Sequence, residues 1–236
     1  MVSIGTLMLN DLRNIIRDRM LLFSAFLFPI VLIILCRLIL PWISENFYDL
    51  TAYYSLLFMM FTIFFPMIFG FIIAFLIMDE RDEDLLIVLR VMPISRTSYL
   101  LYRMILMLFL CFIFVFTFPA LSGLITISLI DYLPIAVLFS IFAPILALIV
   151  NNLANNKIQA FAIFKMLGSV FFIPLFSFFI AEDWKYILGI IPNFWTFNAL
   201  ERVLTTGNQD VVFLGVGFAV HLALLGALFY LFNKKY

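Results

Sequence analysis

The chain has 236 residues, of which 66% are hydrophobic and 12% are charged, and its 14 basic residues balance its 14 acidic ones. A mean hydropathy of +1.21 is far above what a soluble domain of this length requires, which excludes an ordinary soluble enzyme or binding domain. Neither the net charge nor any basic tail indicates nucleic acid as a partner.

Six apolar stretches are long enough to cross a bilayer, whose hydrocarbon core of about 30 Å needs roughly 20 helical residues. They are 20–43, 50–78, 100–130, 132–154, 158–181 and 210–232. The sequence therefore predicts an all-α integral membrane protein, with six transmembrane helices in a single transmembrane domain surrounded by lipids. Cys36 and Cys111 lie inside predicted spans and indicate no disulfide framework.

Residues 1–19 precede the first span and predict an amphipathic helix that lies in the headgroup plane of the membrane. Its apolar residues recur at helical spacing, and Arg13, Arg17 and Arg19 make it cationic. The alternative is that this stretch is only the positively charged flank of the first span. A cleaved signal peptide is disfavoured, because no small-residue cleavage site follows the apolar run.

Residues 79–97 form a charged connector between the second and third spans and begin with the sequence DERDED. Acidic residues suit the amino-terminal end of a helix, an apolar stripe follows them, and Pro93 ends the helix. Because such a stripe would be exposed to water unless something covered it, the connector is predicted to dock a partner. The alternative is a solvated loop whose acidic residues offset nearby arginines.

Residues 182–209, between the fifth and sixth spans, are too polar at their ends to span the membrane and too apolar in the middle for an ordinary loop. Breaks at Gly189, Pro192 and Asn193 predict two short helices, one over 184–190 and one over 194–204. These helices either cap the outer mouth of the bundle or dip back into the membrane.

The distribution of cations predicts that both termini are cytoplasmic, because Lys and Arg gather in short cytoplasmic loops. This orientation leaves only Arg37, Lys185 and Arg202 outside, and it places all three tryptophans at the outer face of the cell membrane. The cytoplasmic cations are then Arg13, Arg17, Arg19, Arg81, Arg90, Arg96, Arg103, Lys157, Lys165, Lys234 and Lys235.

Charged and titratable groups are costly within hydrocarbon and often mark function there. Four residues are therefore candidates for the translocation path or for a dimer interface: Arg37, Lys165, His221 and Glu201. Arg37 and Lys165 have an alternative, which is to extend their side chains to the nearer headgroups, and Arg103 is expected at the membrane interface. If Arg37 faces the path instead, it is expected to pair with Glu45, Asp49 or Glu201.

Catalytic and metal sites are not predicted. The single histidine, His221, is better explained by helix packing or by hydrogen bonding in the lumen than by catalysis. One histidine and two scattered thiols lack the spacing of a metal site.

The connector also carries the most specific resemblance to a known family, the permease subunits of type-2 ABC exporters. Members share an acidic, basic, acidic sequence, then Gly-Thr, a run of leucines, a proline and a serine before a basic residue. The residues in register are Glu80, Arg81, Asp82, Glu83, Leu85, Leu86, Leu89, Pro93, Ile94, Ser95 and Arg96. The usual Gly-Thr is absent, with Asp84 and Leu85 near its place. The order of segments along nearly the whole chain is similar as well.

This resemblance implies an amino-terminal elbow helix, a broken extracellular hairpin, and a coupling helix in the connector that docks on a cytoplasmic ABC ATPase through the residues above and Arg90. It also implies a second copy of the permease, or a related permease, in a homodimer or heterodimer. Because the chain lacks a G-x-x-x-x-G-K-[ST] sequence, ATP and Mg²⁺ are expected on the ATPase, and this chain is not expected to be an enzyme or to bind a cofactor.

The paucity of charge in the spans favours a hydrophobic or amphipathic cargo such as a drug, toxin or antimicrobial peptide. An alternative function from another class is a membrane-embedded sensor or immunity-type binding protein that docks a partner other than an ATPase.

Overall fold

The computed structural model describes residues 13–82, 96–180 and 183–235, and every regular element in these ranges is helical. Six helices in the described ranges are long and apolar enough to cross a membrane: Arg19–Asn46, Thr51–Arg81, Thr97–Ser122, Leu129–Leu153, Lys157–Phe179 and Val211–Lys235. The prediction of an all-α membrane protein with six spanning helices is therefore confirmed.

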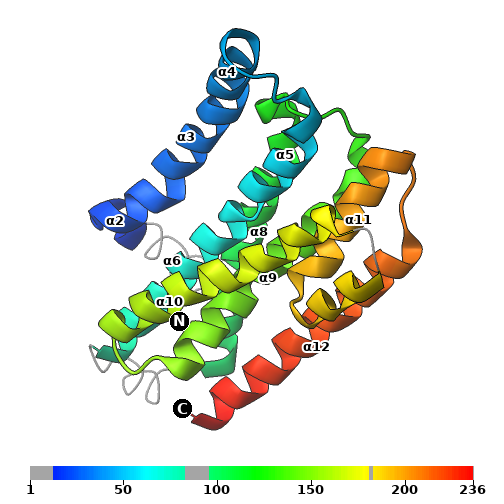
Figure 1. The fold of residues 1–236 in the computed structure, drawn as a ribbon. Helices are drawn as coiled ribbons and strands as arrows, with labels where there is room; N and C mark the ends of the chain where they lie inside the picture. The colour runs from blue at the N-terminus through cyan, green and yellow to red at the C-terminus, as the bar shows by residue number, and fades with distance from the viewer. Residues whose placement is uncertain (1–12, 83–95, 181–182, 236) are drawn as a thin grey trace.

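The first spanning helix contains two π-helical turns. It consists of α2 (Arg19–Leu22), η1 (Phe23–Leu27), α3 (Phe28–Ile34), η2 (Leu35–Ile39) and α4 (Leu40–Asn46). Each π turn ends just before a proline, Pro29 or Pro41, because proline lacks the N–H for the helical bond and its ring crowds the preceding turn. This helix stands at one edge of the bundle, where much of its surface is exposed (Figure 1).

The second and fourth spanning helices form the centre of the bundle. The second consists of η3 (Thr51–Tyr53), α5 (Tyr54–Thr62) and α6 (Phe64–Asp82). The fourth is α9 (Leu129–Leu153), which packs against α6, α8 (Arg96–Ser122) and α12 (Val211–Lys235). Residues 138–148 of α9 are all buried, so the other helices pack around this one.

The third spanning helix, α8, ends at Ser122, earlier than the expected residue 130. Gly123 follows with a φ of +66°, a left-handed conformation that ends helices and that glycine adopts without strain. An irregular stretch then leads to α9, which begins at Leu129.

The fifth spanning helix consists of α10 (Lys157–Phe172) and η4 (Ile173–Phe179), and two short helices follow it, η5 (Asp183–Ile190) and α11 (Asn193–Thr206). The two short helices correspond to the expected pair over 184–190 and 194–204. Rather than capping the bundle, α11 packs against α9 and α12, and its Phe194, Phe197 and Leu200 are fully buried (Figure 1). Within the hairpin, α11 therefore packs among the spanning helices, whereas η5 has no buried residue.

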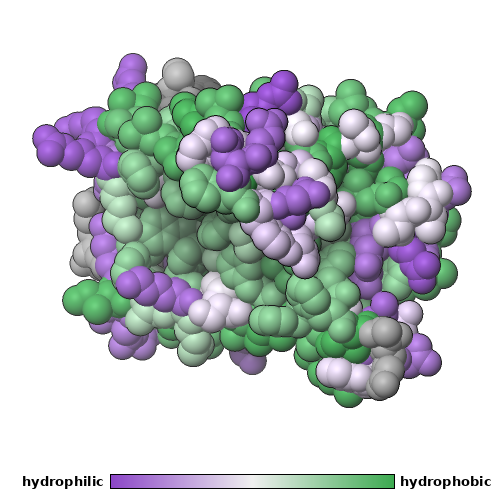
Figure 2. All heavy atoms as spheres, turned by 45° about the horizontal axis from the view of Figure 1, so that its top comes forward, coloured by the Kyte–Doolittle hydropathy of each residue, from purple (hydrophilic) through white to green (hydrophobic). Residues whose placement is uncertain are grey.

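The surface of the protein is largely hydrophobic. Figure 2 shows it obliquely from the end that carries α4, with hydrophilic side chains gathered in patches and a hollow lined by hydrophobic residues. Large apolar side chains are exposed along the outer helices, including Ile105 of α8 and Val211 of α12. Lipid explains this surface, since hydrocarbon tails are as apolar as these side chains.

The close approach of α6 to α9 depends on Gly70. A Cβ atom at this position would lie 2.8 Å from the carbonyl oxygen of Ala143 and 2.9 Å from the Cβ of Leu146. A larger residue would fit only if the backbone moved, as at other membrane helix crossings built on small residues.

We expect Gly70→Leu to lower the free energy of unfolding by about 1–3 kcal/mol, because overpacking a filled core has this cost. The matched control is Gly215→Leu, since a Cβ atom at Gly215 meets no atom within 4 Å. Thermal unfolding of both variants in the same detergent measures the difference. Equal melting temperatures would contradict the close packing of α6 on α9.

Candidate functional site

The last described turn of α6 carries the charged residues Asp79, Glu80 and Arg81, and each of these three contacts a different helix. Asp79 contacts α10, Glu80 contacts α8, and Arg81 contacts the end of α9. These three residues and their partners are called the basal cluster below; its members are Asp79, Glu80, Arg81, Tyr99, Arg103, Ala154 and Lys157.

The pair of Glu80 with Arg103 is the most buried contact of the basal cluster. Two nitrogens of the Arg103 guanidinium donate to the two carboxylate oxygens of Glu80, each at 2.7 Å, which is a bidentate geometry. Tyr99, one turn before Arg103, donates its hydroxyl hydrogen to Glu80 and accepts a hydrogen bond of 2.9 Å from Arg103. The Arg103 side chain is 1% exposed and that of Glu80 is 15% exposed, so the pair is largely withdrawn from water.

The contacts of Asp79 and Arg81 are more exposed. Asp79 forms an ion pair with Lys157, the first residue of α10, and these side chains are 30% and 45% exposed. Arg81 donates to the carbonyl oxygen of Ala154, at the end of α9, over 3.1 Å. An exposed ion pair contributes at most about 1 kcal/mol. Removing one partner of a buried pair costs about 3–5 kcal/mol. Loss of one partner is therefore expected to cost much more at the Glu80–Arg103 pair than at the Asp79–Lys157 pair.

Glu80 and Arg81 were expected to dock the ATPase. In the structure both contact residues of the same chain, Arg103 and Ala154 respectively. Their partners hold the helix that leads into the connector, so these two residues fix where the connector begins. The other expected docking residues lie outside the described residues, apart from Arg96, which begins α8; they are Glu83, Leu85, Leu86, Leu89, Arg90, Pro93 and Ser95. The docking role of the connector stays a prediction.

Arg103 was expected at the membrane interface, and the structure shows that its side chain is buried and paired with Glu80. The carboxylate and the Tyr99 hydroxyl together satisfy the guanidinium, which therefore has no need to reach the headgroups. Two signals in the sequence point to this pair. Tyr99 and Arg103 are one helical turn apart, and Glu80 and Arg103 flank the connector of two antiparallel spans.

The elbow arginines lie around a sharp bend before the first span. Arg13 and Arg17 belong to a helical segment over residues 13–17, and Arg19 begins α2 after the bend at Asp18. The Asp18 carboxylate accepts from the backbone N–H groups of Met20 at 2.8 Å and Leu21 at 3.1 Å. Capping of this kind stabilises the start of α2. All three arginines are exposed.

The four residues expected at the translocation path or dimer interface are not brought together. The guanidinium of Arg37 lies against Gly123, and among the described residues it forms no ion pair with Glu45, Asp49 or Glu201. Lys165 is exposed on α10, with its ammonium 4.5 Å from the centroid of the Phe161 ring.

His221 and Glu201 lie apart from those two cations. His221 is fully buried, with Nδ1 2.8 Å from the carbonyl oxygen of Gly217 and its ring at a steep angle to Phe142 of α9, which is a helix-packing position. Glu201 is half-buried on α11. Burial raises the pKa of the Glu201 carboxyl group, and the charges of Lys185 and Arg202 partly oppose this shift.

Comparison with known proteins identifies the family. The family described as "Fluoroquinolones export permease protein Rv2686c-like" matches residues 11–229. The chain belongs to this family. Its relatives include the fluoroquinolones export permease proteins Rv2686c and MT2760 of two Mycobacterium tuberculosis strains, H37Rv and CDC 1551. Each is 28% identical over 235 residues, which cover 96% of this chain and 92% of the relative. No solved structure matches the chain significantly.

Membership of this export permease family confirms the prediction that the chain is a permease of the ABC exporter class. The basal cluster thus lies in a transport protein, at the base of the connector expected to dock an ATPase.

We expect Glu80→Gln to destabilise the folded protein by about 3–5 kcal/mol, because Arg103 would keep its charge inside the bundle without a carboxylate. Lys157→Gln, which removes the exposed ion pair, should cost no more than about 1 kcal/mol. Thermal unfolding in detergent compares the two variants.

The double variant Glu80→Gln/Arg103→Met provides the control, since it removes the unpaired charge and should regain part of the lost stability. If Glu80→Gln were as stable as Lys157→Gln, the buried pair would not be what holds α6 to α8.

Proposed function

We propose that this chain is the membrane subunit of an ATP-driven exporter that moves amphipathic drugs, fluoroquinolones among them, out of the cytoplasm. The names of both relatives support this class of cargo. The energy would come from a separate ABC ATPase that binds ATP and Mg²⁺, and a second permease copy or a related permease would complete the pathway. Both termini are cytoplasmic in this proposal, which puts the connector on the same side of the membrane as the ATPase.

The basal cluster is the observation that carries the proposal. The connector begins directly after α6 and ends at α8, and the Glu80–Arg103 pair joins these two helices at that end. A movement of the docked connector would therefore reach α6 and α8 together. It would reach α9 through the close packing of α6 on α9 at Gly70, and α10 through the exposed contact of Asp79 and through aromatic rings.

The magnitudes indicate which contact gives way during transport. Moving a two-state equilibrium from 1:99 to 99:1 requires about 5.5 kcal/mol of differential interaction. The exposed Asp79–Lys157 pair resists with at most about 1 kcal/mol. The buried Glu80–Arg103 pair resists more, because separating it breaks two parallel charge-assisted hydrogen bonds at once. We infer that α6 and α8 move as one body, and that α10 is the helix that separates from α6.

Aromatic rings fill the rest of the contact between α6 and α10. The ring centroids of Phe64 and Phe172 are 5.3 Å apart, and those of Phe71 and Phe164 are 5.1 Å apart. When α10 separates from α6, a flat aromatic drug would find rings of the same kind to pack against. This aromatic contact supports an aromatic, amphipathic cargo.

Docking of the ATPase is tested at Leu86, in the apolar stripe of the connector. We expect Leu86→Asp to insert into the membrane normally but to lose the ATPase on mild detergent extraction, because an unpaired charge buried in an interface costs several kcal/mol. Leu86→Met conserves the volume and serves as the control. The readouts are the amount of ATPase that co-purifies and the drug-stimulated hydrolysis of ATP.

Equal recovery of the ATPase with Leu86→Asp and Leu86→Met would contradict docking through this stripe. If the wild-type protein instead co-purified with a partner that hydrolyses no ATP, the exporter proposal would fail in favour of a membrane-embedded sensor.

A further inference from the structure

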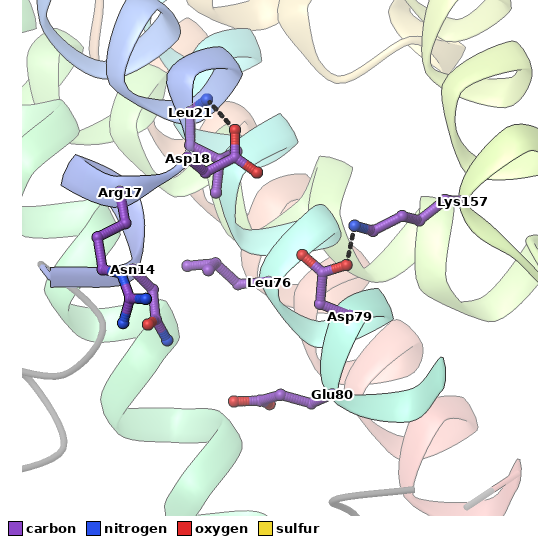
Figure 3. Close-up of a pocket in the computed structure, with 8 residues that line it drawn as sticks. All are labelled: Asn14, Arg17, Asp18, Leu21, Leu76, Asp79, Glu80 and Lys157. Atoms are coloured by element: carbon purple, nitrogen blue, oxygen red, sulfur yellow. Dashed lines mark hydrogen bonds and ion pairs between the residues drawn. The ribbon is translucent and has the colours of Figure 1, made fainter. Parts of the chain in front are cut away.

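A polar cavity of about 480 Å³ lies beside the basal cluster. Its walls come from the amino-terminal segment on one side and from the start of α10 on the other, with the end of α6 between them (Figure 3). The lining residues are Asn14, Arg17, Asp18, Leu21, Leu76, Asp79, Glu80 and Lys157. Apolar and charged side chains thus share one cavity, at the end of α6 where the connector begins.

The three carboxylates of the cavity all have partners. Asp79 pairs with Lys157, Glu80 pairs with Arg103, and Asp18 caps α2. With Arg103 included, three cations balance three carboxylates around the cavity, so its total formal charge is zero.

Arg17 is the exception among these charges. Within the described part of the chain it has no ion pair and no hydrogen bond from its side chain, and it lines the cavity together with Asn14 of the same helical segment (Figure 3). A guanidinium presents a planar fork of donors that matches a carboxylate or a phosphate in two parallel hydrogen bonds. An anionic oxygen group on a ligand would therefore complete the site at Arg17.

The opposite wall suits a cation. Asp79 holds the Lys157 ammonium in a contact that is partly open to water, and an ammonium group on a ligand is chemically equivalent to that lysine. Leu21 and Leu76 supply apolar surface between the two walls. A cavity with an unpaired guanidinium on one wall and a partly exposed carboxylate on the other fits a molecule with an acid at one end and an amine at the other.

We propose that this cavity binds the exported compound on its cytoplasmic side, and that the compound is an amphipathic zwitterion whose carboxylate lies on Arg17 and whose ammonium lies at Asp79. This inference rests on the proposed export function and names the cargo by its charges. Many fluoroquinolones are molecules of this kind, since they join an aromatic acid to a basic amine.

Binding in this pose would also loosen the joint between α6 and α10. The ammonium group of the compound competes with Lys157 for Asp79, and the Asp79–Lys157 pair is the weak contact between these two helices. Occupancy of the cavity and separation of α10 are therefore linked through one carboxylate.

The test measures uptake of a zwitterionic fluoroquinolone and of its methyl ester into inverted membrane vesicles that contain the permease with its ATPase. We expect Arg17→Gln to raise the half-saturating concentration of the acid about tenfold or more, because a charge-assisted bidentate contact is lost. The ester, which lacks the anion, should be transported alike by wild type and variant.

Arg13→Gln is the matched control, since Arg13 lies on the same helical segment, is exposed and does not line the cavity. It should change the transport of neither compound. Arg17→Lys keeps the charge but lacks the planar fork of donors, so its half-saturating concentration for the acid should lie between those of wild type and Arg17→Gln. If Arg17→Gln does not insert into the membrane, Arg17→Lys is tested in its place.

An equal half-saturating concentration of the acid in Arg17→Gln and Arg13→Gln would overturn the inference. A phospholipid headgroup with a phosphate and an amine has the same chemistry, so bound lipid is counted by native mass spectrometry. One contrary outcome is that Arg17→Gln loses a bound phospholipid and yet transports the acid and the ester with the half-saturating concentrations of wild type. The cavity would then be a lipid site, and the inference would fail. Wild-type vesicles that accumulate neither compound would instead overturn the proposed function.

Discussion

A buried ion pair between Glu80 and Arg103 joins α6 and α8, the two helices on either side of the connector. Charged groups are costly among membrane helices, and this pair is tolerated because two parallel hydrogen bonds and the Tyr99 hydroxyl satisfy both partners. The two residues lie on the helices that enter and leave the connector, so the pair sets the spacing of both ends of that segment. Removing either partner would leave an unpaired charge in the bundle, so this pair is expected to be more costly to disrupt than the exposed Asp79–Lys157 pair.

The basal cluster combines this buried pair with an exposed one, and in the proposed mechanism the difference sets the direction of movement. Asp79 and Lys157 are partly exposed and separate at low cost, whereas α6 stays with α8. The polar cavity opens beside the same weak contact, and the aromatic contacts of α6 with α10 continue beyond it. The proposed cargo site, the proposed joint with α10 and the connector thus all lie around the last turn of α6.

Composition and hydrophobic length were sufficient to predict six spanning helices, and the glycine and proline breaks predicted both short helices of the hairpin. The sequence predicted less well the contacts of residues whose partners are distant along the chain. Arg103 reads as an interfacial cation until Glu80 is known to lie opposite it, and Glu80 and Arg81 read as docking residues because the motif of the connector includes them. The end of α8 was misplaced because the residues after Gly123 are as apolar as the helix, and only the backbone angle of that glycine marks the boundary. The cavity was out of reach, since its walls come from three segments that are far apart in the sequence.

Drug exported per ATP hydrolysed, measured on the purified exporter in lipid vesicles, tests the central claim most directly. With equal amounts of folded complex, Glu80→Gln should keep hydrolysing ATP but export clearly less drug per ATP, because the buried pair would no longer hold α6 and α8 together. Arg202→Gln, which removes an exposed ion pair with Asp210 outside the basal cluster and the cavity, should stay close to the wild-type ratio. A wild-type ratio in Glu80→Gln would contradict the account, because movement of the connector would then reach the spans without the buried pair.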